Sequence, residues 1–305
     1  MERRGNWKKW MVCALYISLL ATPSLAVSAS EEGELTEFIT ARDRPYLSLG
    51  ANLSEQQRST VLDLLGIAPE ELDNYDVIYT TINEEYQYLG SYLPKETIGS
   101  KCLSSVLIVK REQGYGINIT TNNISYCTIG MYKNALLTAG ISDADIIVAA
   151  PFPISGTGAL VGTLKTYSVM TGEQVPEENV DAALNELVLT GDLAETLGDS
   201  QQVEEFMAYL KQQILEKELD SPEEIRQAVE DAMLEFKISL SEEDMQKVTN
   251  LLEKIGGLDL NVDDLMSQAG DLYEKISDIG ESSGIFDKVA DFFRSIWDYI
   301  KRLFS

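Results

Sequence analysis

Two cysteines, and the strands expected around them, are the clearest chemical feature of this sequence. Residues 101–111 and 116–128 are rich in Ile, Val, Thr and Ser, which is typical of β-strands. The Gly-Tyr pair at 114–115 fits a type II′ hairpin turn, and the register of that hairpin places Cys102 opposite Cys127. Cα atoms at such a non-hydrogen-bonded position lie about 4.5 Å apart, which suits a disulfide. We therefore predict a Cys102–Cys127 disulfide; the alternative is two free buried thiols.

Four carboxylates are candidates for general acid or base chemistry. Glu84 and Glu85 are adjacent, and Asp143 and Asp145 lie one residue apart. An enzyme that cuts a wall polymer would need two of them about 5–10 Å apart in a common cleft. The commoner interpretation is that the two glutamates stabilise the first turn of a helix and that the two aspartates form a solvated turn.

The chain has no histidine. This excludes Ser-His-Asp and Cys-His activation of a nucleophile, as well as histidine-ligated zinc. No Asp-x-Asp-x-Asp-Gly loop for calcium is present either. We therefore predict no metal, no cofactor and no catalytic residue.

A short loop between an expected strand at 144–150 and an expected helix at 159–170 is a candidate anion site. It consists of Ser155, Gly156, Thr157 and Gly158. Free backbone N–H groups at a helix N-terminus can hold a small anion, but the spacing matches neither nucleotide-binding fingerprint. The alternative is that the glycines let the helix pack closely on the sheet, with Ser155 or Thr157 as its N-cap.

Residues 1–29 resemble a secretory signal peptide, because basic residues are followed by an apolar run and then by small residues. The apolar run is short for a membrane span, so a retained anchor is the alternative. The expected location is extracytoplasmic, either secreted or associated with a membrane. The formal net charge of −26 repels nucleic acid, so no nucleic acid partner is expected.

The chain divides into five expected parts. These are the signal peptide 1–29, a loose acidic segment 30–46, an α+β core domain 47–175, a helical region 176–280, and a hinge with an amphipathic helix at 281–305. The predicted fold class is α+β, with a small mixed or antiparallel sheet and flanking helices, followed by an all-helical C-terminal region.

The expected elements follow from capping residues and periodicity. A helix should begin at the cap Ser54, with Gln57 completing a capping box, and Asn83 should cap a helix over 84–89. Pro151 should end the strand that begins at Ala144. Further elements are expected as a strand at 76–82 and helices at 131–139, 176–190, 201–219, 222–236, 242–255 and 262–279.

Residues 285–304 form a strongly amphipathic pattern. On a helix, the apolar side chains fall on one side and the charged ones on the other. The apolar face is Ile285, Phe286, Val289, Phe292, Phe293, Ile296, Trp297, Ile300, Leu303 and Phe304. This helix either docks on the protein's own core, lies on a membrane surface, or enters the groove of an envelope protein.

Three longer motifs stand out, MYKNALLTAGI at 131–141, AAPFPISGT at 149–157 and ELVLTGDLA at 186–194. They resemble the YpuA-like family of secreted bacterial proteins of unknown function. The resemblance covers about residues 47–255, and the cysteine pair and the helix beyond Gly280 lie outside it. It implies an extracytoplasmic protein with no established activity.

The sequence therefore favours a non-enzymatic binding or structural role at the cell envelope, with the terminal helix as the contact element. An extracytoplasmic carboxylate enzyme and a small-anion binding module are the alternatives. The oligomeric state does not follow from the sequence.

Overall fold

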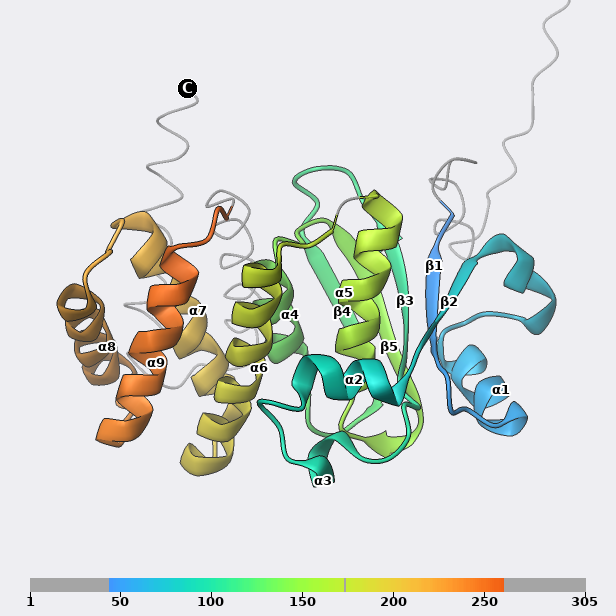
Figure 1. Cartoon of the computed structure of the whole chain (residues 1–305), viewed down its shortest axis with the longest axis horizontal. Coiled ribbons are helices and arrows are strands. Elements are labelled where there is room, and N and C mark those ends of the chain that lie inside the picture. The colour runs from blue at the N-terminus through green and yellow to red at the C-terminus, as the bar shows by residue number, and fades with distance from the viewer. Residues whose placement is uncertain (1–43, 173, 261–305) are drawn as a thin grey trace, which may run out of the picture. The chain divides into compact units, whose positions relative to one another are not determined.

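The computed structural model describes residues 44–172 and 174–260 (Figure 1). The predicted signal peptide, the acidic segment up to residue 43, the helix at 262–279 and the apolar face at 285–304 lie outside the described residues. Within the described part, no helix combines the length and the apolar character that a membrane crossing requires.

Five strands form one mixed sheet, which confirms the α+β class. The strands are β1 (Tyr46–Gly50), β2 (Asp76–Thr80), β3 (Ser105–Lys110), β4 (Ile117–Ile124) and β5 (Ala144–Ile154), in the order β2-β1-β3-β5-β4. The pairs β1/β2 and β4/β5 are parallel, whereas β3 runs antiparallel to both of its neighbours.

The predicted hairpin between residues 101–111 and 116–128 is wrong. β3 and β4 do not pair with each other, because β5 lies between them. The reason is the continuous apolar run at 146–150, whose residues face both sides of the sheet and are buried best in an inner strand. The register that placed Cys102 opposite Cys127 therefore does not exist.

β5 also continues past the proline that was expected to end it. Its partner β3 stops where Ser105 pairs with Ala149, so a proline at 151 removes no hydrogen bond from that side of the ladder. On its other side β5 rejoins β4 at Ile154, beyond a bulge at Asn123. Asn123 has a φ of 60° and donates its side-chain amide to the carbonyl of residue 150 over 2.9 Å.

Helices cover the two faces of the sheet unequally. The face with Ile108 and Ile146 packs against α2 (Ile82–Leu89), α4 (Ile129–Thr138), α5 (Thr157–Thr171) and α6 (Glu177–Leu197). The opposite face, with Leu47 and Leu107, packs against α1 (Glu55–Leu64). In Figure 1, α1 lies beside β1 and β2.

The capping predictions hold in part. Ser54 and Gln57 form the expected capping box of α1. The cap of α2 is Thr81 rather than Asn83, and Glu84 completes its capping box. Short turns at η2 (Pro69–Asn74) and α3 (Lys95–Ile98) complete the described elements of the sheet region.

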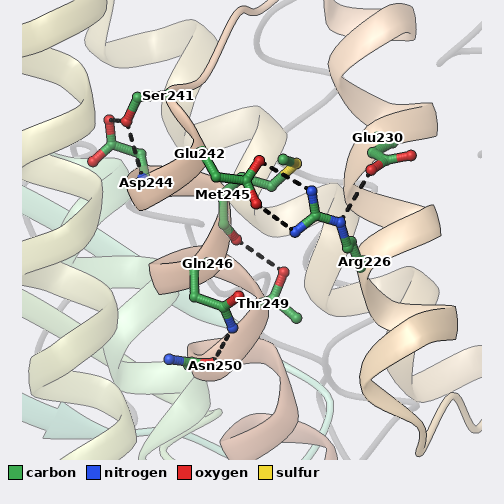
Figure 2. Close-up of polar contacts among 9 residues, drawn as sticks. All are labelled: Arg226, Glu230, Ser241, Glu242, Asp244, Met245, Gln246, Thr249 and Asn250. Atoms are coloured by element: carbon green, nitrogen blue, oxygen red, sulfur yellow. Dashed lines mark hydrogen bonds and ion pairs between the residues drawn. The ribbon is translucent and has the colours of Figure 1, made fainter.

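The helical region has a core of its own. It contains α7 (Ser200–Glu216), α8 (Pro222–Phe236) and α9 (Glu242–Gly256), which pack with α6 around apolar side chains such as Phe206 and Leu252. On its surface, Arg226 of α8 binds both carboxylate oxygens of Glu242 at the start of α9, over 2.9 and 3.1 Å (Figure 2).

The predicted end of a helix at Gly191 is wrong, because α6 continues to Leu197. A Cβ at Gly191 would lie 2.5 Å from the hydroxyl of Tyr126. The glycine therefore serves the close approach of an aromatic side chain to the helix and does not terminate it.

Candidate functional site

The carboxyl ends of all four parallel strands meet at one edge of the sheet, together with the beginning of β3. This is the edge at which open α/β sheets commonly bind ligands. Here it holds a group of polar side chains that we call the carboxyl-edge cluster. Its members are Glu85, Cys102, Ser104, Cys127, Tyr132 and Thr157, all of them buried.

Glu85 is the central member of the cluster. Its side chain comes from α2 and is only 2% exposed. One carboxyl oxygen accepts a hydrogen bond of 2.5 Å from the hydroxyl of Thr157. Burial raises the pKa of Glu85, while hydrogen bonds from Thr157 and Cys102 partly offset that rise. The carboxyl is therefore easier to protonate than an ordinary glutamate.

The two cysteines are free thiols in the structure. Burial raises the pKa of Cys102, and the neighbouring Glu85 carboxyl raises it further. Burial also raises the pKa of Cys127, although a hydrogen bond from the hydroxyl of Tyr132 opposes that rise. Because the thiolate is the nucleophile, neither cysteine is poised for nucleophilic chemistry. The Cys102–Cys127 disulfide is not formed in the structure and stays a prediction. The hairpin register from which it was predicted does not exist.

The 155–158 loop begins α5 differently from the sequence-based expectation. Gly156 is the N-cap and no side chain caps the helix, so Ser155 and Thr157 are not N-caps. Thr157 is the first helical residue and points its hydroxyl at Glu85. The N–H of Ala159 donates to the hydroxyl of Ser104 over 2.9 Å and to the carbonyl of Gly156 over 3.0 Å.

Gly158 explains why glycine is present in this loop. A Cβ there would lie 2.6 Å from Cys102 Sγ, 2.9 Å from Glu85 Oε2 and 3.0 Å from Ser104 Oγ. The protein's own carboxyl thus occupies the N-terminus of α5, where a bound anion would sit. This favours the close-packing interpretation of the loop over the anion site.

The four candidate carboxylates do not come together. Asp143 and Asp145 lie at the start of β5, at the opposite edge of the sheet from Glu85. Asp143 accepts a hydrogen bond from the N–H of Gly116 over 2.9 Å. Asp145 accepts one from Nε of Arg111 over 2.5 Å. Both aspartates therefore hold the connection between β3 and β4 in place.

Glu84 also has a role within the fold. Besides capping α2, it forms an ion pair of 2.6 Å with Lys165 of α5. Partial burial raises the pKa of Glu84, but the hydrogen bonds from Lys165 and Thr81 outweigh it, and the net pKa is lowered. It therefore acts as an ionised anchor between α2 and α5.

A second buried polar group was not expected from the sequence. The ammonium of Lys211 in α7 lies 2.8 Å from Glu186 Oε1 of α6, 2.9 Å from the carbonyl of Asn134 and 3.1 Å from Thr138 Oγ1. It links the helical region to α4 beside the sheet. The sequence pattern does indicate a buried lysine, because Lys211 lies on the apolar stripe that Met207 and Ile214 define along α7.

Among the described residues, no group of three or more Cys, Asp and Glu side chains has the arrangement of a metal site.

Replacing Glu85 with Gln should change how stability depends on pH. Because the folded pKa of Glu85 is raised, the folded state binds this proton more tightly than the unfolded state. The stability that this proton binding contributes to the folded state is fully present below the unfolded pKa of about 4.3. It is lost as pH rises through the folded pKa of Glu85. Glu85→Gln should remove this decline, so the melting temperature relative to wild type should rise from acidic to neutral pH.

The measurement is thermal unfolding of both proteins across that pH range. Glu112→Gln is the matched control, since Glu112 is exposed and should leave the difference constant. Parallel curves for wild type and Glu85→Gln would show that the buried carboxyl does not carry the predicted proton linkage.

Comparison with known proteins places the chain in a family. A family model described as "Protein of unknown function (DUF1002)" matches residues 49–272. A relative from Bacillus subtilis (strain 168), described as "Uncharacterized protein YpuA", is 32% identical over 303 residues, covering 98% of this chain and 99% of the relative. No solved structure matches.

The alignment with the relative extends beyond the expected shared part of about 47–255. The family model ends at residue 272, so the segment beyond Gly280 lies outside it, as expected, whereas the alignment with this relative covers 98% of the chain and takes in most of that segment. With a family model that matches well over half of its length and a relative that aligns almost end to end, the chain belongs to the DUF1002 family of proteins of unknown function.

Proposed function

We propose that this chain is an exported, non-enzymatic binding protein of the cell envelope, with residues 285–304 as its contact element. One observation supports the proposal that the protein is not an enzyme: each of the four candidate carboxylates is either buried or bound to another group of the protein. Glu84 is ion-paired, Glu85 is buried, and Asp143 and Asp145 hold the connection between β3 and β4. None of them is a free carboxylate that faces a cleft with a second one.

The state of the thiols supports the same conclusion. Cys102 and Cys127 have raised pKa values and lie in the interior. A catalytic thiol needs a lowered pKa and access to its substrate. The cluster around Glu85 therefore stabilises the start of α5 and the segment before β3.

The binding part of the proposal rests on the amphipathic pattern of residues 285–304. Ten large apolar side chains of this segment, five of them aromatic, fall on one side of a helix, and every charged side chain falls on the other. Such a pattern suits an apolar surface bordered by water, as at a membrane or in a groove of another protein. The leader-like pattern of residues 1–29 supports a location outside the cytoplasm.

Tryptophan fluorescence tests this proposal directly. The chain has three tryptophans, and two of them, Trp7 and Trp10, lie in the leader. In the mature protein, Trp297 is therefore the sole tryptophan and reports on the contact element alone. Vesicles of phosphatidylglycerol, and separately of phosphatidylcholine, should shift its emission to shorter wavelength and should carry the protein into the pellet on sedimentation.

A matched pair of variants isolates the apolar face. Phe293→Asp introduces a charge on that face, and Ser295→Asp introduces the same charge on the polar face. The first variant should stay in the supernatant and the second should sediment like wild type. If no protein sediments and Phe293→Asp instead lowers the melting temperature, the helix belongs to the protein's own core and membrane contact is refuted.

A further inference from the structure

The two outer strands of the sheet differ in how their free edges are protected. β2 is only five residues long. Asp76 at its start pairs with Arg44 over 3.5 Å. The ammonium of Lys165 donates to the carbonyl of Tyr79 over 2.7 Å. Short length and charged groups are the usual means by which proteins block an edge strand from pairing with another chain.

β4 has none of these features. It is eight residues long and reads Ile-Asn-Ile-Thr-Thr-Asn-Asn-Ile. It lies in a stretch from Gln113 to Tyr132 that contains no charged residue, in a chain of which 24% is charged. β4 also contains no proline. The edge of β4 is therefore protected neither by short length nor by charged groups, the two features that protect β2.

The outward-pointing groups of β4 follow from its pairing with β5. The carbonyl of Gly116 accepts the N–H of Ala144, so the even-numbered residues that follow turn their backbone groups toward β5. Ile119 and Thr121 therefore direct their N–H and C=O groups away from the sheet. No backbone or side-chain group within 44–172 or 174–260 forms a hydrogen bond with these groups.

We propose that β4 is a pairing edge for a second copy of this chain, joined antiparallel through Ile119 and Thr121 about a two-fold axis at Thr120. Two five-stranded sheets would then form one continuous ten-stranded sheet. In this register Thr120 faces its own copy, and Asn118 faces Asn122. Cross-strand pairs of such polar side chains stabilise a sheet, and no two like charges are opposed.

The self-complementary register is the argument for a second copy as the occupant, and the absence of charge on β4 is what lets two acidic copies approach there. The chain carries a net charge of −26, so two copies repel each other over most of their surfaces. An uncharged strand is where that repulsion is weakest. Added salt screens the remaining repulsion, so the dimer should strengthen with ionic strength, whereas an interface held by salt bridges would weaken.

The test is the mass in solution of the mature protein, measured by light scattering over a range of protein and salt concentrations. Wild type should reach twice the monomer mass. Thr121→Pro removes one outward N–H but leaves the bonds to β5 intact, and Thr120→Lys places a charge on the edge. Both variants should have the monomer mass and an unchanged circular dichroism spectrum.

Tyr79→Lys is the matched control, since Tyr79 is 48% exposed on the opposite edge strand; this variant should dimerise like wild type. Hydrogen exchange gives a second measurement, in which the amides of Ile119 and Thr121 should be protected in wild type and exchange at least tenfold faster in Thr120→Lys. A wild type that is monomeric at every concentration and salt, with or without protection of these amides, overturns the proposal. So does a dimer that persists in both β4 variants, or one that Tyr79→Lys also dissociates.

Discussion

Lys211→Met should lower the free energy of unfolding by about 3–5 kcal/mol, the cost of breaking a buried ion pair from one side. Lys211 and Glu186 are 2% and 0% exposed, and their charged atoms lie 2.8 Å apart. Methionine fills a similar volume but leaves the carboxylate of Glu186 in the interior with only the hydroxyl of Thr138 as a donor. Urea unfolding of wild type and variant measures the difference.

The double variant Lys211→Met, Glu186→Leu shows whether the loss comes from the unpaired charge. Replacing both partners of a buried pair with apolar residues is often neutral or stabilising, so most of the lost stability should return. Lys247→Met is the control for an exposed pair, since Lys247 contacts Glu243 at the surface, and it should leave the unfolding midpoint unchanged. A double variant as unstable as Lys211→Met would contradict the explanation.

Gly158→Ala should lower the free energy of unfolding, because the added methyl group enters the carboxyl-edge cluster. The new Cβ would lie 2.6 Å from Cys102 Sγ and 2.9 Å from Glu85 Oε2, and both side chains are buried. Overpacking of this kind costs about 1–3 kcal/mol. Thermal and urea unfolding should both report the loss.

Cys102→Ala removes the sulfur atom that the new methyl group meets. The double variant Cys102→Ala, Gly158→Ala should therefore be more stable than the sum of the two single changes predicts, which a double-mutant cycle measures. Gly257→Ala is the control, because a Cβ there meets only ordinary contacts at 3.5 Å or more. Strict additivity of the two changes would show that the clash with Cys102 is not the cause.

Local features of the fold were predictable and non-local ones were not. α8 has the bounds expected from Ser221 as cap and Pro222 at the first helical position, and the capping box at Ser54 is present. Both depend on residues within one helical turn. The hairpin failed because a turn signal at 114–115 says nothing about a strand that begins thirty residues later and inserts between its two arms.

The cluster around Glu85 was missed for a similar reason. From the sequence, Glu85 looks like any acid in the first turn of a helix, and its neighbour Glu84 does behave in that way. What buries Glu85 is the packing of α2 on α5 and of the segment with Cys102 between them, and this is a tertiary arrangement. Polar residues on apolar stripes, such as Lys211, were the one sequence signal for buried networks that a closer examination could have found.

The strand order has a consequence for the growing chain. β5 is the last strand to be synthesised, yet it occupies an inner position between β3 and β4. Until Ile154 has emerged, β3 lacks a neighbour on one side and β4 has no partner at all. Every fragment that ends before β5 therefore presents unpaired strand edges, which are templates for aggregation. The sheet can therefore close only when β5 enters and joins its two halves.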